Sequence, residues 1–150
     1  MRAGLLLFLV VVVGTLETAF GWPPSIGLAL GVATAAAFLP GLATAVLVGS
    51  TALALAEWSA GLPVGAWPLG ATVGLVLAQQ IVHRGRPGLL DRGVALLLVA
   101  IPGLLCAVVF SFATGNPTGV SGLFNGGLYL LSALLLSGGA ARVLIGPRAL

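Results

Sequence analysis

Long apolar runs, separated by short groups of proline, glycine and charge, dominate this chain. A helix needs about 20 mostly apolar residues, and at least about 17, to cross the hydrocarbon core of a bilayer. On that rule we expect six helices, at residues 3–20, 25–39, 42–60, 68–83, 93–112 and 124–145. The pattern predicts an all-α integral membrane protein, in which residues 1–150 form a single transmembrane domain built as a six-helix bundle.

Proline and glycine mark the breaks between these runs. Pro23-Pro24 ends the first helix and favours the start of the second, because proline is tolerated in the first turn of a helix but not in its interior. Pro40-Gly41 separates the second helix from the third. If Pro40 only kinks one longer helix, the chain has five spans instead of six.

The arginines discriminate between five and six spans. All six basic residues are arginines, at the two ends and in one central segment: Arg2, Arg84, Arg86, Arg92, Arg142 and Arg148. With six spans they all lie on one side of the membrane, which the positive-inside rule makes the cytoplasm. With five spans, Arg2 would lie across the membrane from Arg142 and Arg148. Six spans with both termini in the cytoplasm are therefore favoured.

Composition also excludes several function classes. Only 6% of the residues are charged, against about a quarter in water-soluble domains. The net charge of +3 comes from separated arginines rather than a basic stripe, so we expect no nucleic-acid partner. One cysteine and one histidine build neither a disulfide nor a metal site. No nucleophile–base or phosphate-binding motif is present, so we expect no catalytic residue, no cofactor and no enzymatic activity.

Two pairs of glycines predict close helix packing. Gly27 and Gly31 lie in the second expected helix, and Gly70 and Gly74 lie in the fourth. Small residues four positions apart share one helix face and let two backbones approach closely in a membrane. We interpret these four glycines as packing residues within the bundle.

Glu17 and Glu57 lie in the last turns of the first and third expected helices, on the side without arginines. A carboxylate there meets the negative end of the helix dipole, which is unfavourable. Each must be hydrated, protonated, hydrogen-bonded to neutral groups, or paired with a cation from another molecule. Under the last hypothesis, Glu57→Arg should disrupt a partner complex and leave expression intact.

Glu57 also opens a local motif, EWSAGLPVG at residues 57–65. Gly61 is placed to close the third helix, and Pro63 prevents its continuation. The spacing acid-x-x-x-Gly-x-Pro-x-Gly, between two membrane helices, resembles the rod shape-determining protein MreD family. In that family an Asp usually opens the motif, and an acid often follows the earlier proline where this chain has Ser25.

The resemblance implies a non-enzymatic membrane scaffold of the bacterial cell-elongation machinery, which builds peptidoglycan in the cytoplasmic (inner) membrane. Its direct partner would be MreC, a single-span protein, and through it MreB and a RodA-type synthase complex. It also implies a fold similar to the substrate-binding subunits of energy-coupling transporters. We name residues 57–65 together with Glu17 the outer lip, and its partner-binding candidates are Glu17, Glu57, Trp58, Gly61, Pro63 and Gly65.

Two other functions remain open at this point. A small-molecule-binding subunit of an energy-coupling transporter would have a similar size. Its usual lid between the first two helices would here be only residues 21–24, and the first helix lacks small docking residues. An accessory subunit of another membrane complex is also compatible with so few charges, as is a lipid ligand on the outer face.

Overall fold

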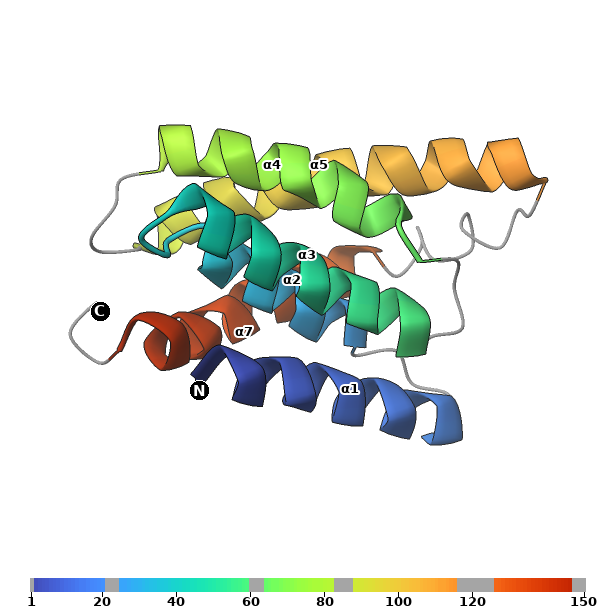
Figure 1. Ribbon diagram of the computed structural model, residues 1–150, viewed down its shortest axis with the longest axis horizontal. Helices are drawn as coiled ribbons and strands as arrows, with labels where there is room; N and C mark the ends of the chain where they lie inside the picture. The colour runs from blue at the N-terminus through green and yellow to red at the C-terminus, as the bar shows by residue number, and fades with distance from the viewer. Residues whose placement is uncertain (1, 21–24, 60–63, 83–87, 116–125, 147–150) are drawn as a thin grey trace.

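The computed structural model describes residues 2–20, 25–59, 64–82, 88–115 and 126–146. Within these ranges the chain forms six α-helices and no strand: α1 (Arg2–Phe20), α2 (Ser25–Ala36), α3 (Leu42–Ser59), α4 (Ala66–Ile81), α5 (Leu89–Thr114) and α7 (Gly126–Ile145). The all-α prediction is thereby confirmed for the described part of the chain. The helices lie roughly along one common axis, and consecutive helices run in opposite directions (Figure 1).

The start of α1 and the end of α7 lie at the same end of this bundle (Figure 1). The first residue of α1 is Arg2, Arg92 lies in the first turn of α5, and Arg142 lies in the last turn of α7. These three helix ends share one end of the bundle, which we call the arginine end. The end of α3 and the start of α4 lie at the opposite end, so the described residues of the outer lip are separated from the described arginines by the length of the bundle.

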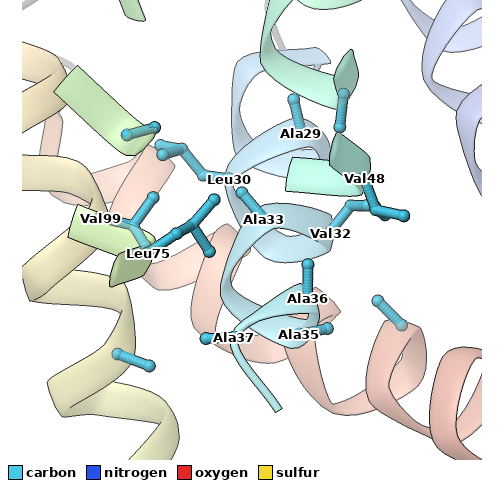
Figure 2. Packing of buried hydrophobic residues seen from close by; sticks show 14 of the residues in the cluster. Ala29, Leu30, Val32, Ala33, Ala35, Ala36, Ala37, Val48, Leu75 and Val99 are labelled. Atoms are coloured by element: carbon cyan, nitrogen blue, oxygen red, sulfur yellow. The ribbon is translucent and has the colours of Figure 1, made fainter. Parts of the chain in front are cut away.

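Helix α2 occupies the centre of the bundle. It contacts α1, α3, α4, α5 and α7, and every residue from 27 to 39 is buried. Leu30 of α2 meets Leu75 of α4 and Val99 of α5 on one side, while Val32 meets Val48 of α3 on another (Figure 2). Most other positions of α2 are alanine or glycine, so five helices can approach one short helix closely.

The break between α2 and α3 is sharper than a kink. Helix α2 ends at Ala36 rather than at residue 39, and the chain then tightens, with the Phe38 and Leu39 amides donating to carbonyls three residues earlier. Pro40 explains the early end, because a residue before proline disfavours the helical conformation. Helices α2 and α3 then run in opposite directions, so they are two helices rather than one kinked segment.

The remaining helix boundaries differ from the expected ones by up to four residues. Helix α4 begins at Ala66, which places Pro68 in the first turn, where its missing N–H costs no intrahelical bond. Helix α5 begins at Leu89, four residues before the expected start. Asp91 and Arg92 therefore belong to its first turn and not to the segment before the helix. It continues through Pro102 for 26 residues, about 39 Å at the standard helical rise.

Two helices of the described chain, α3 and α5, are long and apolar enough to cross a membrane. Shorter apolar helical stretches are Ala3–Val13, Gly27–Ala36 and Leu130–Ile145. Large apolar side chains also point outward, among them Leu47 on α3, Leu69 on α4 and Leu135 on α7. An exterior of this kind suits a hydrocarbon surrounding better than water.

Glycines on α4 form its contact with α5. A Cβ atom at Gly70 would overlap the carbonyl oxygen of Pro102, and one at Gly74 would overlap the carbonyl oxygen of Leu98. The packing role expected for these two glycines is the one they have in the structure. Gly31 likewise lies against α7, where a Cβ would come within 3.2 Å of the Ala133 carbonyl oxygen, and Gly27 is buried in α2.

The contact at Gly74 has a second cause in Pro102. A proline has no N–H, so the carbonyl four residues earlier, that of Leu98, loses its intrahelical partner. A Cα hydrogen of Gly74 points at this oxygen along the direction that a Cβ would take. Weak Cα–H···O contacts of this kind recur between closely packed helices. Gly74 therefore approaches α5 at the one carbonyl that Pro102 has freed.

We expect Gly74→Ala to lower the free energy of unfolding by about 1–3 kcal/mol, the usual cost of overpacking a close contact. The matched control is Gly139→Ala, because Gly139 is exposed in α7 and has nothing within 4 Å of a built Cβ. That control should be neutral or stabilising by up to about 1 kcal/mol, since alanine favours the helix over glycine. Thermal unfolding in mild detergent measures both, and equal effects would contradict the close approach of α4 to α5.

Candidate functional site

The Glu57 carboxylate is the most constrained polar group of the outer lip. It lies in the last turn of α3 with only 3% of its surface exposed. Its Oε2 accepts a hydrogen bond from the Gly65 amide at 2.6 Å, and its Oε1 accepts one from the Trp67 amide at 2.8 Å. Both carboxylate oxygens are therefore bound to the start of α4.

These bonds supply a cap that α4 lacks in its own sequence. The N-cap residue is Gly65, which has no side chain to accept the free amides of the first turn. Pro68 has no amide to satisfy, so the Gly65 and Trp67 amides are two of the donors that need a partner. A negative charge is stabilised at a helix N-terminus, which offsets its unfavourable place at the end of α3.

The backbone of Gly65 explains the last position of the motif. Its φ is 131° and its ψ is −25°, in a region that residues with a Cβ rarely adopt. A glycine here lets the chain turn into α4 with its amide aimed at Glu57. The acid and the final glycine of the motif thus belong to one structural device, while Gly61 and Pro63 lie outside the described residues.

Of the four states considered for Glu57, the structure shows hydrogen bonding to neutral groups. The Glu57→Arg expectation stays a prediction, and these hydrogen bonds add that the variant should also destabilise the start of α4. An arginine accepts no hydrogen bond, and it would place a second positive charge at the positive end of α4. Loss of a partner complex in that variant would not distinguish a lost contact from a disordered lip.

The exposed side chains of the outer lip are different residues. Trp58 follows Glu57 directly, yet 65% of its surface is exposed, and Val64 at the start of the next turn is also exposed. Glu17 lies near the C-terminal end of α1, and α1 contacts α3. The structure does not describe the Glu17 side chain. A partner that approaches this part of the bundle would meet Trp58 and Val64 before it met Glu57.

Trp67 is a site residue that the motif alone did not indicate. Its amide is the second donor to Glu57, and its indole lies over α5 at Gly103, where a Cβ would come within 2.6 Å of the ring. The signal available in the sequence is a helix that begins Gly-Ala-Trp-Pro with no capping side chain of its own. Such a start requires an acceptor from elsewhere, and Glu57 is the nearest acid in the chain.

An apolar groove of about 330 Å³ lies between α4 and the second half of α5. Its lining residues are Ala66, Leu69, Leu105, Cys106, Val109, Phe110 and Ala113. These side chains can contact hydrocarbon, and they present no charged or hydroxyl group to orient a polar substrate. Cys106 is the single cysteine of the sequence and is partly exposed in this groove.

Two further polar contacts join helices. Ser50 of α3 and Thr72 of α4 are 2.9 Å apart, and Thr72 also donates to the Pro68 carbonyl, which leaves Ser50 as the donor between them. Gln79 of α4 is buried, and its amide nitrogen donates to the Leu39 carbonyl at 2.9 Å. The second contact satisfies a carbonyl at the α2–α3 break, where the helix ladder has stopped.

The predicted arginine positions are partly described. Arg92 is partly buried in the first turn of α5, and Arg142 is exposed in the last turn of α7. Arg2 begins α1, whereas Arg84, Arg86 and Arg148 lie outside the described residues. No group of three or more metal-ligating side chains occurs among the residues that the structure covers.

Comparison of the chain with protein-family models, curated proteins and solved structures gives no match. The residues and their geometry therefore carry the functional argument.

Glu57→Ala should expose the dependence of α4 on its cap. It leaves two amides without their acceptor, so we expect a loss of about 2 kcal/mol in the free energy of unfolding. Hydrogen exchange at the Trp67 amide should become roughly tenfold faster or more, because the first turn of α4 opens locally. Glu57→Gln should have a smaller effect, since its amide keeps one acceptor oxygen.

The matched control for this experiment is Ser59→Ala. Ser59 lies in the same last turn of α3, but its hydroxyl donates within α3, to the Ala56 carbonyl at 3.0 Å. It should leave exchange at Trp67 unchanged. Unaltered exchange in Glu57→Ala would contradict the role of Glu57 as the cap of α4.

Proposed function

We propose that this chain is a six-span protein of the bacterial cytoplasmic membrane that acts as a non-enzymatic scaffold of the cell-elongation machinery. Its partner would be a single-span membrane protein of the MreC kind, with MreB and a RodA-type synthase complex reached through that partner. The supporting observation is the turn at residues 57–65. The resemblance to the MreD family rests on this motif, and its acid and last glycine have a defined structural purpose.

The geometry of the turn favours a binding role over a chemical one. Glu57 accepts hydrogen bonds from two backbone amides and so joins the end of α3 to the start of α4, while Trp58 and Val64 are exposed. An exposed tryptophan next to such a fixed contact is typical of the anchor residues in protein interfaces. The outer lip would contact the extramembrane part of the partner, and an apolar helix face would contact its membrane span.

The proposed membrane topology follows from helix direction and charge. The start of α1, the start of α5 and the end of α7 lie at one end of the bundle with the described arginines, and the positive-inside rule supports a cytoplasmic location for that end. Helices α3 and α5 have the length and composition of spans. The central α2 is short, but its backbone is surrounded by other helices, so it need not reach both membrane surfaces.

Reporter fusions test this topology. We expect a fluorescent protein that folds only in the cytoplasm to be bright when it is fused to either terminus, and an alkaline phosphatase that is active only outside to be inactive there. The same phosphatase inserted after Val64 should be active, because this residue belongs to the opposite end of the bundle. Opposite results for the two termini would indicate an odd number of spans and contradict the proposal.

Affinity purification from native membranes tests the partner. The tagged chain in mild detergent should retain a single-span protein with a large domain outside the cytoplasm. Trp58→Ala should reduce its recovery about fivefold or more, since truncation of an interface tryptophan commonly costs over 1 kcal/mol. The control is Leu135→Ala, which removes a similarly exposed apolar side chain from α7, away from the outer lip.

Two outcomes would overturn the scaffold proposal. Equal recovery of the single-span protein with Trp58→Ala and with the unchanged chain would remove the outer lip from the interface. Recovery of an ATPase pair with a membrane coupling subunit would instead indicate the substrate-binding subunit of an energy-coupling transporter. Monomeric dispersity in detergent should be checked for both variants, so that lost recovery reflects a lost contact.

A further inference from the structure

Arg92 has an environment that its own chain does not complete. It lies in the first turn of α5, and its side chain reaches across to α7, where a Cβ at Gly138 would overlap its Nη1 atom. Its Nε is buried and has no hydrogen-bond partner. The Nε has been withdrawn from water without receiving an acceptor, which costs free energy, while the Arg92 side chain as a whole is partly exposed and can still meet an anion.

Arg142 lies on the same face of α7 as Gly138. It comes four residues after Gly138, about one helical turn nearer the end of α7. Its side chain is exposed. Glycine at residue 138 leaves room between α5 and α7 for the Arg92 guanidinium, and Arg142 adds a second positive charge on that face of α7.

The acids of this chain leave these arginines largely uncompensated. The sequence has three: Glu57 caps α4 at the opposite end of the bundle, Glu17 lies near the last residue of α1, and Asp91 directly precedes Arg92. Consecutive residues of a helix point in directions about 100° apart, so Asp91 does not share the side of α5 on which Arg92 meets α7. Within the described part of the chain, no acceptor reaches the Arg92 Nε.

We propose that the surface where α5 meets α7 at the arginine end binds a phosphate group, held by Arg92 and Arg142. The guanidinium fork matches the oxygens of a phosphate and binds them with charge-assisted hydrogen bonds. The start of α5 adds positive partial charge, because its N-cap is Gly88, which has no capping side chain. In a bilayer the available phosphate is the headgroup of an anionic phospholipid, a ligand typical of basic pockets between membrane helices.

The inference rests on the membrane location in the proposed function, but not on the scaffold role or on the outer lip. The two can therefore fail separately. Loss of phospholipid binding would leave the Trp58 pull-down unaffected, and the converse also holds.

The test uses the purified full chain, first in detergent stripped of lipid and then titrated with solubilised phosphatidylglycerol or phosphatidylcholine. Bound lipids are counted by native mass spectrometry. We expect phosphatidylglycerol to bind more tightly than phosphatidylcholine, and Arg92→Gln and Arg142→Gln each to weaken it about tenfold, as for the loss of one charge-assisted pair. Arg2→Gln removes the same charge from the same end of the bundle, on α1, and should change binding less than about twofold.

Arg142→Gln keeps the test decisive if Arg92→Gln unfolds, because Arg142 is exposed and removing its charge does not disturb the packing between α5 and α7. Arg92→Lys serves as a second folded variant: it retains the charge, loses the fork, and should weaken binding by an intermediate factor. Unchanged phosphatidylglycerol binding in Arg142→Gln would overturn the proposal. So would an equal loss in Arg2→Gln, which would indicate general attraction between the arginine end and anionic lipid.

A titration with inorganic phosphate distinguishes the two sources of the ligand. Displacement of phosphatidylglycerol by millimolar phosphate, dependent on Arg92, would identify the phosphate group alone as sufficient and admit a free phosphate ligand. Retention of the lipid under those conditions would identify the phospholipid headgroup, held by its acyl chains as well as by the two arginines.

Discussion

A buried backbone polar group without a partner costs free energy, and helix ends and breaks leave such groups free. At three places in the described chain another helix supplies the partner. Glu57 of α3 accepts hydrogen bonds from the Gly65 and Trp67 amides at the start of α4, and Gln79 of α4 donates to the Leu39 carbonyl at the α2–α3 break. The carbonyl freed by Pro102 in α5 faces Gly74 of α4.

These three contacts make α4 the helix that organises the polar interactions of the bundle. It is bound to α3 at its start, to the α2–α3 break near its end, and to the backbone of α5 along its middle. Helix α2 has the complementary role for apolar packing, since its alanines and glycines let five helices surround it. In a bilayer, association gains little from the hydrophobic effect, so close van der Waals contact of this kind supplies the stabilisation.

The two ends of the bundle present different chemistry to their surroundings. At the outer lip Glu57 is hydrogen-bonded to two backbone amides, and Trp58 and Val64 remain exposed, a surface suited to a protein partner. At the arginine end the described arginine side chains are not paired with a described acid of the chain. Arg92 lies between two helices without an acceptor for its Nε, and such a site is suited to an anion. The chemistry of both ends follows from the shortage of charged residues. With three acids and six arginines, the chain can form few ion pairs within itself.

The sequence by itself indicated the all-α class and the order of the helices that the structure describes, because runs of apolar residues and the prolines between them are local signals. It also placed the glycine pair of α4 and singled out residues 57–65. Only the tertiary structure decided that α2 is central, that Glu57 caps α4 rather than facing a partner, and that Arg92 reaches Gly138. The physical reason is that these helices are apolar on nearly every side, so no polar stripe indicates which face turns inward. The partner of each buried group then depends on contacts between residues that are distant in the sequence.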